Sequence, residues 1–306
     1  MKQKIKFGNS IIEYQVVKSK RTKTSQITVD KENVIVRTPK TKSNSAIRQM
    51  IKDRKQWIFK KQLEFVNRER IKPSAKKLNT KIIAFSDGGK LEEYCKKYGI
   101  EYHRIPQFHS PRASLPAYIY TALNVLMPIL PITKADVIES ITKLEEMEKK
   151  ISSYNLTRTN PSLDLAEWIK GIPLIYYPYG LQAAAIRFKN SLQENAKTHA
   201  MIEDVIETCH NGIVSWERPS NVQPVLIEGK DDYIKTKERW DLLKEYFEAN
   251  QIDYREILSV EGNILSKLIN LIYLLDYSTI FLAILNKIDP SPVNSIEFIK
   301  KKASID

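Results

Sequence analysis

The stretch IPLIYYPYGLQAAAIRFKNSLQENAK, residues 172–197, decides the fold. It opens with the apolar run IPLIYYP, and after a turn at Gly180 it continues into a segment rich in Ala, Leu, Gln and Lys. A short apolar run bounded by Pro and Gly is typical of a strand that is buried on both faces. The residue types that follow favour a helix. The stretch therefore predicts a buried strand followed directly by a helix.

The same alternation of strand and helix continues on both sides of this stretch. The expected strands are 81–85, 102–105, 172–178, 222–229 and 254–260, and the expected helices are 91–99, 114–130, 134–153, 163–170, 180–197, 236–251 and 264–286. The run from 198 through His210 to 221 is expected to be irregular. Strands separated by helices of this length indicate an α/β fold with a parallel, doubly wound sheet.

One apolar segment, residues 268–285, is almost long enough to span a bilayer. It carries Asp276 among other polar residues, and a charge is costly in hydrocarbon. We expect a buried helix of the α/β core and no association with a membrane. The first ten residues lack the apolar core of a signal peptide, and Cys95 and Cys209 form no CxxC pair, so a cytoplasmic location is expected.

The first quarter of the chain differs from the rest in charge. Residues 1–80 contain 22 Lys and Arg against 6 Asp and Glu, whereas the remainder has a net charge of −3 and the whole chain +13. Alternating apolar residues predict strands at 4–7, 11–17, 26–29 and 33–37, and a helical apolar side at Ile47, Ile51, Trp57, Ile58 and Leu63. A small antiparallel β-meander followed by a basic helix is therefore expected.

The basic helix allows two interpretations. Its cationic and aromatic side chains interleave at Arg54, Lys55, Trp57, Phe59, Lys60 and Lys61. This mixture suits phosphates and stacked bases, which makes nucleic acid a possible partner. The alternative is a solvated basic face over an amphipathic helix. Charge alone does not separate the two.

Five stretches in the rest of the chain carry a resemblance to a known family. They are AFSDGGKLEEYCKKYGI (84–100), IPQFHSPRASLPAYIYTAL (105–123), the opening stretch, CHNGIVSWE (209–217) and LNKIDPSPVNSIEFIKK (285–301). From about residue 74 to 302 the chain resembles the bifunctional phosphoglucose/phosphomannose isomerases, which contain two sugar isomerase (SIS) domains in tandem. The resemblance implies a C-terminal remnant of the first SIS domain at 74–153 and a second SIS domain at 154–306, and it leaves residues 1–73 as a separate basic subdomain made of the β-meander and its helix.

The resemblance also implies a chemistry. Such enzymes are dimers that interconvert glucose 6-phosphate or mannose 6-phosphate with fructose 6-phosphate through an enediolate, without a metal or cofactor. The family's Pro-Arg-Ala motif places Arg112 beside the enediolate, and its C-terminal lysine corresponds to Lys300. Gly88 and Gly89, between a strand and a helix, would let the backbone approach the substrate.

The family's catalytic base falls in a His-Asn-Glu motif, which here reads His210-Asn211-Gly212. His210 and Asn211 would contact the substrate, but glycine cannot take a proton. Glu217 lies five residues on and matches a family position of its own, so it is a weak candidate for a replacement. The family's ring-opening histidine follows the motif, whereas all four histidines here lie at or before residue 210. Nothing in residues 1–80 resembles the family's phosphate-binding loops.

The N-terminal block, to about residue 70, resembles the leading segment of hydrolases related to zinc metallopeptidases. The resemblance rests on KSKRTKTSQITV, VIVRTPK and IRQMIKDRKQWIFKKQ, but the zinc-binding HExxH helix is absent. Glu203, Glu207 and His210 do not form a credible metal set either. We therefore expect a phosphosugar isomerase family member with weak or lost turnover. The alternatives are a non-catalytic sugar-phosphate binder, a nucleic-acid-associated protein, or two incomplete segments joined near residue 74.

Overall fold

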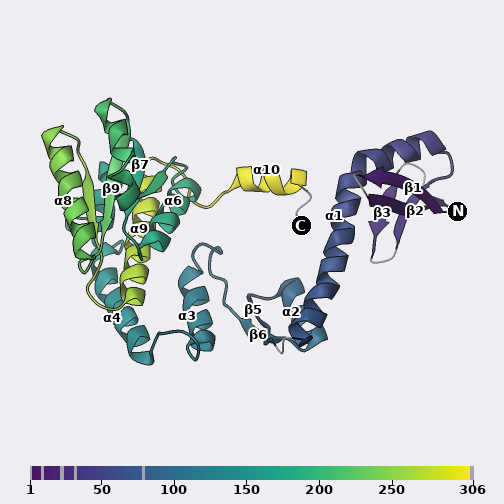
Figure 1. Cartoon of the computed structure of the whole chain (residues 1–306), viewed down its shortest axis with the longest axis horizontal. Coiled ribbons are helices and arrows are strands. Elements are labelled where there is room, and N and C mark those ends of the chain that lie inside the picture. Colours follow the sequence, from purple (N-terminus) through teal and green to yellow (C-terminus); the bar gives the residue numbers. More distant parts are fainter. Residues whose placement is uncertain (1, 8–9, 21–23, 31–32, 78–79, 304–306) are drawn as a thin grey trace. The chain divides into compact units, whose positions relative to one another are not determined.

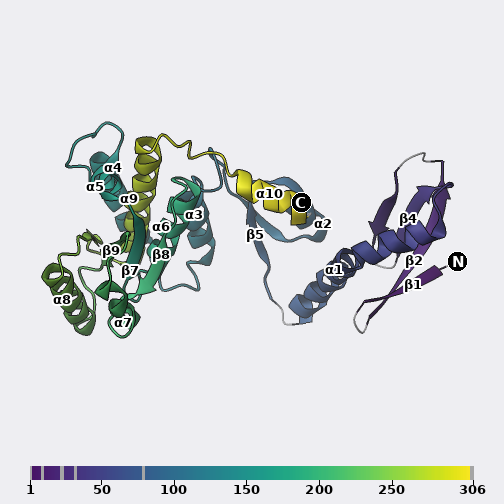
Figure 2. The same cartoon turned by 90° about the horizontal axis from the view of Figure 1, so that it is seen from above.

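The computed structural model describes residues 2–7, 10–20, 24–30, 33–77 and 80–303, and their side chains except at residues 2 and 63–77. The chain forms two compact units, Met1–Tyr118 and Ile119–Asp306. Figure 1 and Figure 2 show the elements of each unit. The three domain limits expected from the sequence stay a prediction.

The first unit opens with a four-stranded mixed sheet. Its order is β1 (Lys2–Phe7), β2 (Ser10–Ser19), β4 (Val34–Pro39) and β3 (Gln26–Val29). The outer pairs are antiparallel, but β2 and β4 are parallel, so the expected antiparallel meander was wrong for the central pair. The connection from β2 to β3 is longer than a tight hairpin turn. This length lets β3 pair with β4 and leaves β4 beside β2.

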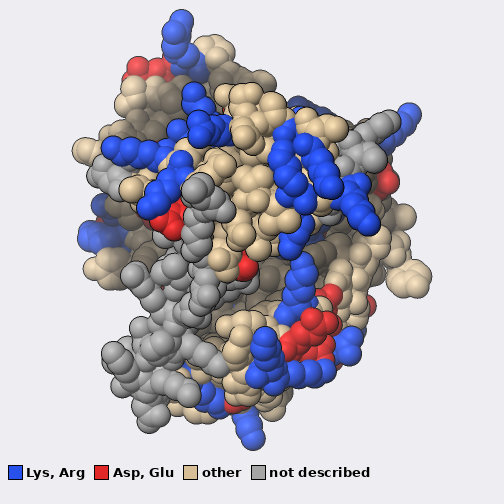
Figure 3. All heavy atoms as spheres, turned by 90° about the vertical axis from the view of Figure 1, so that its right-hand side faces the viewer, with Lys and Arg blue, Asp and Glu red and all other residues tan. Residues whose placement is uncertain are grey.

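The long helix α1 (Asn44–Lys77) packs one side against this sheet. Ile47, Ile51 and Ile58 are buried in a cluster with Ile12 and Val36, as the apolar spacing predicted. Trp57 packs against the same cluster, and the side chain of Leu63 lies outside the described residues. Lys and Arg side chains project from much of the face that carries the sheet and α1 (Figure 3).

A small parallel pair follows in the same unit. It consists of β5 (Ile83–Ser86), α2 (Gly89–Tyr98) and β6 (Glu101–Arg104). Gly88 and Gly89 have φ values of 141° and 69°, a region in which a side chain would be strained. They make the turn that starts α2.

The second unit contains the parallel sheet that the alternation of strands and helices predicted. Its four parallel strands run in the order β10 (Arg255–Leu258), β9 (Val222–Glu228), β7 (Ile172–Tyr177) and β8 (Met201–Asp204). Strand β8 falls in the run that was expected to be irregular, so that expectation was wrong. Only four residues long, it lacks the extended apolar run by which the other strands are found.

Helices cover both faces of this sheet, as expected for a doubly wound fold. Ile175 and Ile227 face one core, which also contains side chains of α5 (Pro161–Trp168), α6 (Gln182–Glu194) and α9 (Ile264–Leu285). The alternate residues Leu174, Tyr176 and Leu226 face a second core with α7 (Val205–Thr208) and α8 (Ile234–Ala249). The alternation follows from the two-residue period of a strand.

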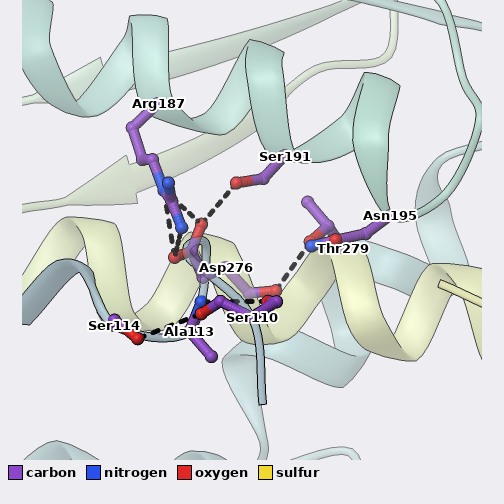
Figure 4. Close-up of polar contacts among 8 residues, drawn as sticks. All are labelled: Ser110, Ala113, Ser114, Arg187, Ser191, Asn195, Asp276 and Thr279. Carbon is purple, nitrogen blue, oxygen red and sulfur yellow. Dashed lines mark hydrogen bonds and ion pairs between the residues drawn. The ribbon is translucent and has the colours of Figure 1, made fainter. Parts of the chain in front are cut away.

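Helix α9 is long and apolar enough to cross a membrane, but 61% of its most apolar window is buried inside the protein. Its acidic residue Asp276 is paired rather than exposed to an apolar environment. Arg187 of α6 donates to both oxygens of Asp276 at 2.8–3.1 Å, and Ser191 Oγ donates to Asp276 Oδ1 at 2.6 Å (Figure 4). Asn195 Nδ2 donates to Thr279 Oγ1 at 2.8 Å. The interpretation as a core helix is therefore favoured.

Three further helices complete the chain. They are α3 (Leu115–Leu126), α4 (Lys134–Ile151), which packs on α9, and α10 (Asn294–Ala303). Helix α10 was not predicted from the sequence. None of its described residues is buried, and Phe298 and Ile299 are each 59% exposed.

Candidate active site

The family motif follows the edge strand β8 and the short helix α7. Tyr176 of β7 and Glu203 of β8 are register partners at the carboxyl ends of these strands. The Asp204 side chain accepts a hydrogen bond from Ile206 N at 2.8 Å and starts the single turn of α7. Ligands of open α/β sheets bind outside the carboxyl ends of the strands, so the position is suited to an active site.

Hydrogen bonds hold the motif residues together in the loop after α7. The backbone N–H groups of His210 and Asn211 both donate to Glu207 O at 3.0 Å. Asn211 Nδ2 donates to Glu207 Oε1 at 2.5 Å. The 3₁₀-helix η1 (Gly212–Glu217) follows, and Ser215 Oγ donates to Gly212 O at 2.7 Å. The structure therefore brings His210, Asn211 and Gly212 together, with the first two exposed.

A carboxylate that was not predicted as a base from the sequence fills the space beside Gly212. A Cβ added to Gly212 would lie 2.8 Å from Glu203 Oε2, 2.9 Å from Glu203 Cδ and closer still to Oε1. These distances are far below van der Waals contact, so a side chain at 212 and the present position of the Glu203 carboxylate exclude each other.

The surroundings of Glu203 affect its ionisation. Burial raises the pKa of the Glu203 carboxyl, the nearby Thr208 hydroxyl opposes this rise, and the charge of Glu207 adds to it. Glu203 is only partly buried, and Thr208 is fully buried and donates to Asp204 O at 3.0 Å. The site thus contains a carboxyl group whose charged form is disfavoured.

An aromatic layer lies under this loop. Trp216 Nε1 donates to the hydroxyl of the buried Tyr176 at 2.9 Å. The rings of Trp216 and Phe247 pack edge-on, with 5.4 Å between their centroids. Burial raises the pKa of Tyr176 well above its usual range. The Tyr176 hydroxyl therefore stays protonated at neutral pH and does not serve as a base.

A hollow of about 660 Å³ lies between α7 with its loop and α8. It is lined by Ile206, Glu207, Cys209 and His210 and, from α8, Lys235, Glu238, Arg239 and Leu242. Cations and carboxylates both line it, and burial raises the pKa of the Cys209 thiol. Among the described residues, no group of three or more His, Cys, Asp or Glu side chains could hold a metal ion.

The other expected site residues occupy different elements. In the first unit, Arg112 lies in the turn where Ala113 N and Ser114 Oγ both donate to Ser110 O at 3.0 Å (Figure 4), and Gly88 caps α2. In the second unit, Lys300 lies in the last turn of α10 and is exposed. The roles of these residues stay predictions.

Comparison with known proteins identifies the family. Residues 158–302 match the family described as the bacterial phospho-glucose isomerase C-terminal SIS domain. The chain is 31% identical over 243 residues to a bifunctional phosphoglucose/phosphomannose isomerase of Caldicellulosiruptor bescii, covering 74% of this chain and 70% of that protein. A protein of the same description from Aquifex aeolicus is 29% identical over 227 residues, covering 72% and 67%.

Solved structures agree on the fold. A glucose-6-phosphate isomerase like protein from Thermus thermophilus superposes with a TM-score of 0.52 at 16% identity, covering 72% of this chain and 77% of that one. Such low identity supports the SIS-type fold and nothing finer. Together with the sequence relatives it leads to one conclusion: the chain belongs to the bifunctional phosphoglucose/phosphomannose isomerase family.

Proposed function

We propose that this chain is a slow phosphosugar isomerase that interconverts fructose 6-phosphate with glucose 6-phosphate or mannose 6-phosphate. The observation that carries the proposal is the loop 209–217, which retains the flanking residues of the family motif and has Gly212 in place of its glutamate. Loss of a positioned base typically costs about 10²–10⁴ in rate. Turnover that is weak rather than efficient therefore fits this loop.

The remaining roles follow the family's motifs. The Arg112 guanidinium is a fixed cation for the developing oxyanion, and Lys300 contacts the sugar near its ring oxygen. His210 and Asn211 contact the substrate, and Gly88 and Gly89 let the backbone approach it. The proposal requires no metal or cofactor, and it includes a homodimer in the cytoplasm.

A second candidate is a non-catalytic sugar-phosphate-binding protein. It is favoured by Gly212, which cannot act as a base. It is also favoured by the positions of the four histidines, which all lie at or before His210, whereas the family's ring-opening histidine follows the motif. A third is a nucleic-acid-associated role for the first unit, favoured by the basic face in Figure 3. The two sugar-phosphate candidates predict the same ligand and differ only in turnover.

The test measures conversion of fructose 6-phosphate to glucose 6-phosphate and mannose 6-phosphate, with binding followed by calorimetry. We expect the wild type to bind fructose 6-phosphate and to turn over slowly, and Gly212→Glu to be faster by a factor of about 10 or more. The matched control Gly212→Gln adds a side chain of the same size without a base, and it should not turn over faster than the wild type. If no variant binds a hexose 6-phosphate, the proposed function is wrong.

A further inference from the structure

The side-chain position that Gly212 leaves vacant is already occupied by a carboxylate. Glu203 Oε2 lies 2.8 Å from where the Cβ of residue 212 would be, and Oε1 is closer. A glutamate at 212 would place its carboxyl carbon two bonds beyond that Cβ, or about 2.5 Å away. The Glu203 carboxylate therefore lies within a few ångströms of the place where the family's base would be.

The fold supplies this carboxylate from an independent element. Glu203 comes from β8, opposite Tyr176 of β7, whereas Gly212 begins η1 on the far side of α7. The segment between these two positions is hydrogen-bonded within itself, through the backbone bonds of α7 and its loop and the bond from Thr208 to Asp204. The carboxylate thus approaches the motif from the sheet rather than from the loop.

The ionisation of Glu203 suits proton abstraction. A base works best when its pKa approaches the working pH, and burial raises the pKa of Glu203 above that of an ordinary glutamate. The neighbouring acids are less suited. Glu207 accepts the side-chain amide of Asn211, and Glu217 is exposed at the end of η1.

We propose that Glu203 is the proton-transfer base of this chain and takes the place of the glutamate missing at position 212. This inference rests on the proposed isomerase function. The Glu203 carboxylate removes a proton from C1 of fructose 6-phosphate, the C–H electron pair forms the C1=C2 bond, and the carbonyl pair moves to O2. The carboxyl group then returns its proton to C2 while the O1 proton passes to O2. The product is the aldose, and the carboxylate is regenerated without an oxidant or a metal.

The test follows exchange of the C1 hydrogen of fructose 6-phosphate with D₂O by NMR, using the full chain. This readout reports the base step alone and does not require net conversion. We expect wild-type exchange, a loss of at least about 10²-fold in Glu203→Gln, and little change in the exposed control Glu245→Gln on α8. Glu203→Gln combined with Gly212→Glu should regain exchange, which shows that the loss is not a folding defect.

The outcomes distinguish this proposal from the one on which it rests. If fructose 6-phosphate binds and Glu203→Gln exchanges as fast as the wild type, Glu203 is not the base. The same holds if the wild type binds but shows no exchange, whereas Gly212→Glu turns over. If neither binding nor turnover occurs in any variant, the isomerase function itself fails.

Discussion

At the scale of single residues, Gly212 is distinguished by the space beside it rather than by its backbone. It is not among the glycines with φ in the left-handed region, so the backbone would accept any residue. A Cβ at 212 would overlap the end of the flexible Glu203 side chain, so a side chain here would displace this carboxylate from its present position. A glycine at 212 is therefore compatible with a base that is supplied by β8 instead of η1.

The raised pKa of Glu203 has a consequence for stability. Folding raises the pKa above that of the unfolded chain, so the folded state binds more protons and loses stability as pH rises through the raised pKa. Glu203→Gln keeps the shape of the protonated group and removes this cost. We expect the variant to melt at a higher temperature than the wild type at pH 7, although its activity is lower.

The difference in melting temperature should shrink as pH falls towards about 4, where Glu203 becomes protonated in both states. Thermal melting over a series of pH values measures this. A wild type that is as stable as Glu203→Gln at pH 7, or a difference that grows towards acid pH, would contradict the assignment of the shift to burial.

The sequence could predict Gly212 but not Glu203, for a physical reason. The motif around Gly212 is contiguous, so its residues are recognised by spacing alone. Glu203 reaches Gly212 through the pairing of β8 with β7, and β8 has four residues without a marked apolar pattern. The one available signal was the pair Met201-Ile202 before two acids, a weak strand pattern directly ahead of the motif.

At the scale of elements, α6 and α9 are joined by an ion pair that the apolar pattern of α9 does not reveal. The side chains of Arg187 and Asp276 are 20% and 25% exposed, and their contact is bidentate. We expect Asp276→Leu to lower the free energy of unfolding by about 2–3 kcal/mol, because it leaves a largely desolvated guanidinium without this carboxylate. Urea denaturation measures the loss.

The double variant Arg187→Leu/Asp276→Leu is the control. Replacing both charges with apolar groups of similar size should recover most of the stability, since neither charge is then left in a poorly solvated position. If the losses of unfolding free energy in Asp276→Leu and in Arg187→Leu simply add in the double variant, the pair does not act as a unit and the prediction is wrong.

At the scale of the whole molecule, the parallel sheet was predictable except for its edge strand β8, whereas the strand pairing of the N-terminal sheet was not predictable. In the second unit each strand is followed by a helix, and short right-handed connections leave few possible topologies. In the N-terminal sheet the four strands were found in sequence, but the segment between β2 and β3 is too long to fix which strands pair. Strand identity is a local property, whereas strand order is decided by packing.

The basic charge of the first unit leads to a prediction about the full chain. If the face shown in Figure 3 binds nucleic acid, the affinity for single-stranded DNA should fall with salt, because bound counterions are released. Arg54 and Lys60 are exposed on α1, near the partly buried Trp57. Replacing both cations with glutamine should weaken binding and reduce the log–log salt slope by about 0.7 for each phosphate that is no longer neutralised.

The matched control replaces Lys149 and Lys150, exposed on α4 of the second unit, and should leave the slope unchanged. Fluorescence anisotropy at several salt concentrations distinguishes the outcomes: no binding at low salt, or equal effects of the two double variants, means that the basic face is only a solvated surface.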